Sequence, residues 1–189
     1  MTDLLASLAD LFTALPALWI AVVFVFSLLV GSFLNVVIHR VPIMLEREWS
    51  TQVEEILRGK QGDVGLKADL QPDQPTSQYN LVVPRSACPK CGTMITAAQN
   101  IPVLSYLWLK GKCASCGTRI SARYPLVELG TAILSALVAW KFGFMWYTAA
   151  ALVHTWVLIA LTGIDIDHQL LPDNMTLPLM WLGLLLSLA

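Results

Sequence analysis

Long apolar stretches and one long polar stretch divide the 189-residue chain. Apolar residues dominate about positions 15–38, 126–140, 145–164 and 177–189. The first run is long enough to cross about 30 Å of hydrocarbon as a helix, whereas the last is shorter than the roughly 20 residues that a spanning helix needs. The pattern predicts an all-α integral membrane bundle, with a first transmembrane helix within 1–38 and further helices, the last one incomplete, within 126–189. No basic residue precedes the first run, which favours an anchor over a cleavable signal peptide.

The polar stretch, residues 39–125, has three parts. Leu45, Trp49, Val53, Ile56 and Leu57 recur at helical spacing among charged residues, which predicts an amphipathic helix. This helix is expected to lie on the membrane surface or to pack against the rest of the loop, and the pattern fits both. Residues 59–83 are rich in Gly, Gln, Asp and Pro and predict a mobile linker. Residues 84–120 contain all four cysteines.

Composition and charge support the membrane class. The chain is 56% hydrophobic and 13% charged, with a net charge of -1, and this balance gives no reason to expect a nucleic-acid partner. Eleven of the twelve Lys and Arg residues and seven of the thirteen acids lie within 39–125. Because basic residues beside membrane helices favour the cytoplasmic side, the polar stretch is predicted to be cytoplasmic. Threading the helices from there places the turn at 165–173 on the same side.

The four cysteines form two Cys-x-x-Cys-Gly motifs, Cys88 with Cys91 and Cys113 with Cys116. Each motif can direct two thiolates at one metal ion, and two motifs complete a closed, tetrahedral zinc site of structural type. Two disulfides or free thiols are the alternative. A reducing cytoplasmic compartment favours zinc, so the sequence predicts a small cytoplasmic zinc ribbon over 84–120.

Ionisable residues near the membrane are candidates for function, because each is costly at the centre of a spanning helix. Glu128 is expected just inside the second spanning helix, where it can pair with Arg123 or Arg119. His154 lies in the middle of the third helix and is interpreted as a hydrogen-bonded core residue. Three acids lie close together in the segment 163–173: Asp165, Asp167 and Asp173.

The three acids raise the possibility of an aspartyl protease, which needs two carboxylates close enough to share one proton. On a helix, Asp165 and Asp167 point to nearly opposite faces, and Asp165 and Asp173 are separated by about 12 Å of rise. Asp173 is interpreted as a helix cap and Asp167 as a solvated interfacial acid. The segment therefore supplies one catalytic carboxylate, Asp165, and its partner is expected from outside this chain.

Several motifs together resemble the bacterial type IV prepilin peptidase family. They are Gly31–Pro42 (GSFLNVVIHRVP), the two cysteine motifs, Asn100–Pro102, Ser105–Tyr106, Gly111–Cys113, Arg123–Glu128 (RYPLVE), Ile164–Asp167 and Leu171–Asp173. The resemblance covers nearly the whole chain apart from the linker. It implies a multi-pass protein of the bacterial inner membrane that cleaves the basic leader of type IV prepilins and type II secretion pseudopilins after a Gly. It also implies N-methylation of the new N-terminus, with S-adenosylmethionine as donor.

The resemblance also implies roles for particular residues. Asp165 matches the first of two catalytic aspartates, and the Gly-x-Gly-Asp motif that carries the second is not found here, so the chain resembles the N-terminal part of the enzyme. Asn35 and Arg40 are expected near the methyl donor, and Glu128 near the leader. The C-terminal remainder of the enzyme is then a partner. Two alternatives stay open: a non-catalytic zinc-ribbon scaffold that binds pilin or secretion components, and a methyltransferase without protease activity.

Overall fold

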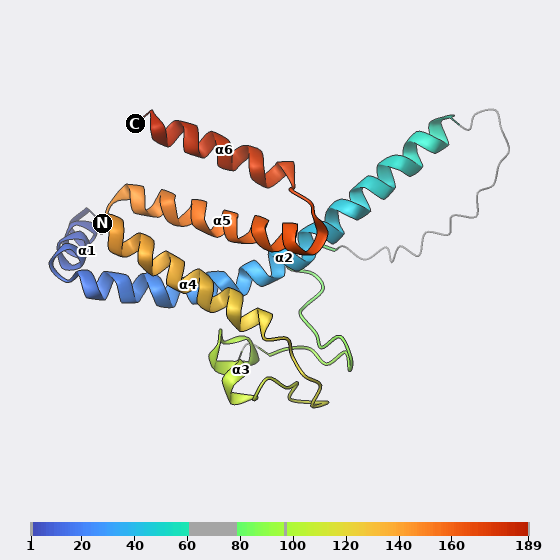
Figure 1. Ribbon diagram of the computed structural model, residues 1–189, viewed down its shortest axis with the longest axis horizontal. Coiled ribbons are helices and arrows are strands. Elements are labelled where there is room, and N and C mark those ends of the chain that lie inside the picture. The colour runs from blue at the N-terminus through green and yellow to red at the C-terminus, as the bar shows by residue number, and fades with distance from the viewer. Residues whose placement is uncertain (1, 61–78, 97, 189) are drawn as a thin grey trace.

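Helices account for most of the fold (Figure 1). The computed structural model describes residues 2–60, 79–96 and 98–188. Within these ranges no strand is present, and the only pairings of strand type are two isolated bridges, Ala87 with Met94 and Lys112 with Arg119. The helices are α1 (Thr2–Ala14), α2 (Pro16–Lys60), the 3-10 helix η1 (Ala98–Asn100), α3 (Leu104–Trp108), α4 (Arg123–Phe142), α5 (Trp146–His168) and α6 (Asp173–Ser187).

Helices α2, α4 and α5 form the bundle, and each is long and apolar enough to cross a membrane. Helix α2 packs most extensively against α4 and less against α5, while α6 touches α5 more lightly. The predicted all-α integral membrane bundle is confirmed. Gly31 allows the close crossing of α2 and α4, because a Cβ at this position would lie 2.7 Å from the Cα of Glu128.

Apolar side chains fill the bundle in two clusters. One joins Leu34, Val37 and Ile38 of α2 to Ala160 and Ile164 of α5. Ile164 directly precedes Asp165, so the helix that carries the acid is held by close packing. The second cluster, toward the other end of the bundle, consists of Val23, Ala139 and Leu152.

Helix α2 is longer than the sequence predicts. The amphipathic stretch around Leu45–Leu57 is the continuation of the first spanning helix and not a separate element. Between residues 38 and 45 only Pro42 disfavours a helix, and Pro42 is fully buried inside α2. A proline within a helix removes one hydrogen bond and bends the axis without requiring an end. Figure 1 shows the last part of α2 leaving the bundle in a new direction.

The turn between α5 and α6 also differs from the expectation. Helix α5 ends at His168, and Gln169 follows in the left-handed conformation, with φ of 51°. Helix α6 begins at Asp173, and its N-cap residue is Pro172, with no side-chain cap. The prediction that Asp173 caps this helix is wrong. As the first residue of α6, Asp173 instead places its charge near the positive end of the helix dipole.

The polar stretch is attached at the end of the bundle where α4 begins (Figure 1). Most of the predicted linker, residues 61–78, lies outside the described residues. The chain is described again from Tyr79 and continues through both cysteine motifs, η1 and α3 to the start of α4. The predicted domain boundaries at 38/39 and 125/126 do not coincide with helix ends, because α2 runs through the first and α4 starts just before the second. The division into domains stays a prediction.

Candidate functional site: a four-cysteine cluster and a groove beside Asp165

The four cysteine sulfurs meet at one point. Their Sγ atoms all lie within 4.8 Å of one another, and the Sγ atoms of Cys88 and Cys116 are 3.8 Å apart. A tetrahedral zinc site with Zn–S bonds of about 2.3 Å places its sulfurs about 3.8 Å apart, so the cluster fits zinc. All four thiols are free, which argues against the disulfide alternative.

Each cysteine motif is closed by the same local geometry. Gly92 and Gly117 both have φ of +69°, a conformation that glycine adopts without strain, and their N–H groups donate to the carbonyls of Cys88 and Cys113. The Sγ of Cys116 lies 3.2 Å from the hydroxyl of Thr118. This contact, followed by a backbone hydrogen bond from Thr118, lowers the pKa of Cys116 to about 6. A low pKa favours the thiolate, which is the form that binds a metal.

Glu128 anchors the ribbon segment to α4. The residue is 8% exposed, and its Oε2 accepts a hydrogen bond of 2.7 Å from the backbone N–H of Val103, just before α3. Val103 has φ of 57°, a left-handed conformation that is costly for a β-branched residue. The predicted ion pair of Glu128 with Arg123 or Arg119 is wrong, because among the described residues Arg123 pairs with Asp167 and no ion pair joins Arg119 to Glu128. Contact between Glu128 and a substrate stays a prediction.

Asn35 and Arg40, the residues expected near a methyl donor, both contact the chain's own backbone. The Asn35 amide donates to the carbonyl of Tyr124 at 3.1 Å, where α4 begins. The buried Arg40 guanidinium donates to the carbonyls of Asn80 and Pro84, at 2.7 and 2.6 Å. These donors hold the polar stretch against α2. Their role near a methyl donor stays a prediction.

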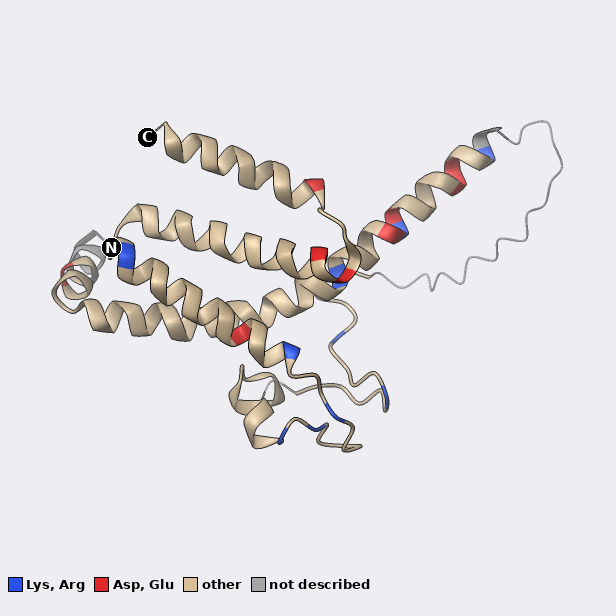
Figure 2. Ribbon diagram, in the orientation of Figure 1, with Lys and Arg blue, Asp and Glu red and all other residues tan. Residues whose placement is uncertain are grey.

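Arg123 joins the start of α4 to the end of α5. Its guanidinium donates to Oδ1 of Asp167 at 2.6 Å and to the carbonyl of Gly163 at 3.3 Å. Asp167 is exposed, as expected for a solvated interfacial acid, and the structure adds its ion pair with Arg123. The two contacts lie on either side of Asp165 along α5. They also show that the aspartate turn and the ribbon are at the same end of the bundle, which Figure 2 illustrates with its cluster of charges there.

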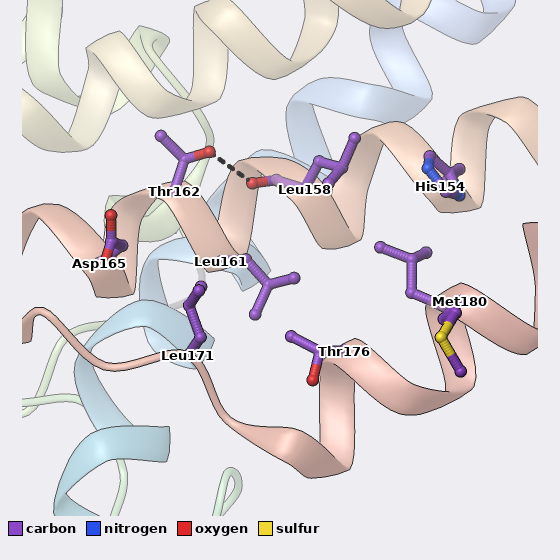
Figure 3. A pocket seen from close by; sticks show the side chains of 9 residues that line it. His154, Leu158, Leu161, Thr162, Asp165, Leu171, Thr176 and Met180 are labelled. Carbon is purple, nitrogen blue, oxygen red and sulfur yellow. Dashed lines mark hydrogen bonds between the residues drawn. The ribbon is translucent and has the colours of Figure 1, made fainter.

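Asp165 lines an open groove between α5 and α6. The groove has a volume of about 430 Å³ (Figure 3). Asp167 and Asp173 are not among its described lining residues. Apolar side chains form most of the wall, so Asp165 is the acidic group in a largely hydrophobic surface. The lining residues are His154, Leu158, Leu161, Thr162, Asp165, Leu171, Thr176, Leu179 and Met180.

The interpretation of His154 as a core residue is wrong, because the side chain is half-buried and lines the groove. His154 lies eleven residues before Asp165, which is three helical turns and about 16 Å of rise, so both side chains share one face of α5. Figure 3 shows Asp165 and His154 at opposite ends of the row of groove-lining side chains on α5. The spacing of eleven residues can be read from the sequence and would have placed His154 on the same helix face as Asp165.

These features define a class: an integral membrane protein with a four-cysteine insertion that fits a metal and an aspartate facing a groove at the same end of the bundle. The model "Bacterial Peptidase A24 N-terminal domain" matches residues 25–142, and the model "Type IV leader peptidase family" matches residues 152–189. The chain belongs to the bacterial peptidase A24 family, and the resemblance found in the sequence is confirmed.

Curated relatives extend this result. Proteins named prepilin leader peptidase/N-methyltransferase are 54% identical in Aeromonas salmonicida, 55% in Aeromonas hydrophila and 50% in Pseudomonas aeruginosa. The three matches cover 96%, 97% and 94% of this chain but 59%, 60% and 58% of the relatives. The chain thus spans about three fifths of their length. No solved structure matches it.

Proposed function

We propose that this chain contributes to a membrane aspartyl endopeptidase that removes the basic leader of type IV prepilins and pseudopilins after a Gly. The observation that carries the proposal is the position of Asp165, an exposed acid lining a groove at the ribbon end of the bundle. A substrate with an apolar helix and a basic leader would place its cleavage site at this boundary. The names of the relatives support the same reaction.

The chemistry requires a second carboxylate. In an aspartyl protease, one carboxylate takes a proton from water, the water oxygen attacks the peptide carbonyl carbon, and the other carboxyl group donates its proton to the carbonyl oxygen. The first carboxyl group then gives its proton to the peptide nitrogen, the C–N bond breaks to release the new amine, and the second carboxylate recovers its proton as the carboxyl product forms. We assign Asp165 to this pair, and the second member to a polypeptide segment outside these 189 residues.

Methyl transfer to the new N-terminus, with S-adenosylmethionine as donor, belongs to the same proposal through the relatives' name. Among the described residues, Asn35 and Arg40 are the side chains that we assign to the neighbourhood of the donor. When bound, the donor would supply the methyl group to the amine. The four-cysteine cluster would hold one Zn²⁺ in a closed set of ligands, which suits a structural role in keeping the ribbon folded.

The ribbon and Asp165 are proposed to face the cytoplasm, in a bacterial inner membrane. Charge supports this orientation, because Arg123 is the first residue of α4 and Arg40 of α2 contacts the polar stretch at the same end of the bundle. Basic residues near the ends of spanning helices are enriched on the cytoplasmic side. A reducing compartment would also keep the four cysteines as thiolates available for zinc.

The test is co-expression of the chain with a tagged prepilin, with and without a C-terminal segment carrying a Gly-x-Gly-Asp motif. Intact mass reads both leader removal and N-terminal methylation. Asp165→Asn is compared with Asp173→Asn, since both acids are exposed on the same turn and Asp165 alone of the two lines the groove. Cleavage that needs the added segment and Asp165, and tolerates Asp173→Asn, supports the proposal.

Other outcomes would favour a different function for the chain. Cleavage by the chain alone would show that both carboxylates lie within these residues. Methylation of a pre-cleaved pilin by the Asp165→Asn chain, without cleavage, would favour a methyltransferase without protease activity. Binding of pilin with neither reaction, even with the added segment, would favour the scaffold.

A further inference from the structure

Helix α3 (Leu104–Trp108) carries an apolar surface that the rest of the described chain leaves uncovered. Leu107 is 65% exposed and Trp108 is 85% exposed, and Leu104 is as open as Leu107. At spacings of three and four residues, these side chains share one face of the helix. The opposite side holds Tyr106, which is half-buried and donates its hydroxyl to the carbonyl of Ile120 at 3.4 Å. The short helix is therefore amphipathic, with its polar contacts toward the ribbon.

A contact with the bundle fixes the position of α3 along the spanning helix α4. Val103, the residue before α3, donates its backbone N–H to Glu128 at 2.7 Å. Glu128 is five residues beyond Arg123, the first residue of α4, which is about 8 Å of helix rise into the candidate membrane span. The beginning of α3 therefore lies beside the first turns of a spanning helix and not above its end. Figure 1 shows α3 next to this part of α4.

The residues around α3 fit the boundary between lipid headgroups and acyl chains. Tryptophan is enriched at this level because its ring is apolar and its N–H can remain hydrated. Lys110 and Lys112 follow α3 directly, and both are exposed. Lysine side chains at this level extend toward the headgroups and are attracted by anionic lipids. An aqueous environment would instead leave three large apolar side chains hydrated beside a membrane-spanning surface.

We propose that α3 is an interfacial helix that inserts Leu104, Leu107 and Trp108 into the lipid bilayer, and so fixes the ribbon against the membrane. The occupant of this surface is lipid. The proposal depends on the membrane-spanning bundle and not on the proposed peptidase activity, so either one can fail while the other holds. It also explains the buried hydrogen bond of Glu128, which holds α3 at the required depth.

Photo-cross-linking tests this surface in the purified full chain, reconstituted into nanodiscs of phosphatidylcholine and phosphatidylglycerol. A benzophenone amino acid replaces Leu107 in the test variant. Met94 is the aqueous control, since it is 61% exposed just after the first cysteine motif, and Leu137 of α4 is the lipid control, at 51%. After irradiation, intact mass measures the fraction of protein that carries a lipid adduct.

The expected adduct yield at Leu107 is close to that at Leu137 and several-fold above that at Met94. A yield no higher than at Met94 would overturn the proposal, and so would a product dominated by cross-links to a second copy of the chain. Fluorescence gives an independent measurement. The emission of Trp108 is obtained by subtracting the spectrum of the Trp108→Phe variant from that of the wild-type chain. Brominated phosphatidylcholine should quench this difference, and a difference that bromination leaves unchanged would also overturn the proposal.

Discussion

The two candidate sites differ in how much of their chemistry is contained in a short stretch of chain. The four-cysteine cluster is complete, with its sulfurs within 4.8 Å of one another and both halves built by similar motifs. The groove has one acid, Asp165, and its walls come from two helices and the turn between them. A metal site made of local motifs can be specified almost residue by residue. A protease site that needs two carboxylates depends on how helices from distant parts of the chain pack.

The largest expected effect separates the two sites by function. In an active enzyme containing this chain, Asp165→Asn should lower the rate of leader cleavage by about 10²- to 10⁴-fold, because it removes a group that transfers protons. Zinc content should be unchanged, since the cysteine cluster does not involve Asp165. Single-turnover cleavage and metal analysis measure the two quantities. Wild-type cleavage by the variant would remove Asp165 from the mechanism.

Loss of the metal should act on the other site first. Cys88→Ser leaves three thiolates, so the bound zinc should fall from about one per chain and the segment 84–120 should become sensitive to protease. Helices α4 and α5 should stay protected, because their packing does not involve the cysteines. Ser115→Ala, in the second motif, is the matched control. Equal protection of 84–120 with and without metal would show that zinc is not structural here.

The crossing of α2 and α4 supports both sites, and glycine substitutions probe it. Gly31→Ala places a Cβ 2.7 Å from the Glu128 Cα and should destabilise the bundle by about 1–3 kcal/mol, the usual range for overpacking. Gly130→Ala meets no atom within 4 Å and should be neutral or slightly stabilising. Thermal unfolding in detergent compares the two variants. An equal effect of both substitutions would contradict the close crossing.

The smallest expected effect on stability concerns the ion pair that joins the ribbon end of α4 to the aspartate turn. Arg123 and Asp167 are partly exposed, so Arg123→Ala should change the free energy of unfolding by less than about 1 kcal/mol. Leader cleavage should nevertheless fall, since the contacts of Arg123 lie on either side of Asp165 on α5.

A charge exchange tests whether the geometry of this pair matters. Arg123→Asp combined with Asp167→Arg should recover more cleavage activity than either single variant, because the pair can form again with its charges reversed. Arg119→Ala serves as the control for loss of a nearby positive charge. Activity in the double variant no better than in the single variants would show that Arg123 does not position the turn.

Sequence reasoning succeeded where one short segment or one composition decides the outcome. The apolar runs predicted the helices long enough to span a membrane, and the cysteine motifs predicted the cluster of four thiols. It failed for ionisable residues whose partners are distant in sequence. Glu128 accepts from Val103, twenty-five positions away, and Asp167 pairs with Arg123, forty-four positions away. His154 was also missed as a groove residue, although its helical spacing from Asp165 is visible in the sequence.

The sequence by itself determined that this chain is a helical membrane protein of the peptidase A24 family, with four candidate thiolate ligands and Asp165 as its candidate catalytic acid. Hydrophobic length and local motif chemistry suffice for those conclusions, since each depends on neighbours along the chain. Only the tertiary structure decided that α2 continues past Pro42, that Arg123 holds the aspartate turn, and that Glu128 contacts the residue before α3. Those outcomes depend on which helices cross and how closely, and that is decided by packing between residues far apart in sequence.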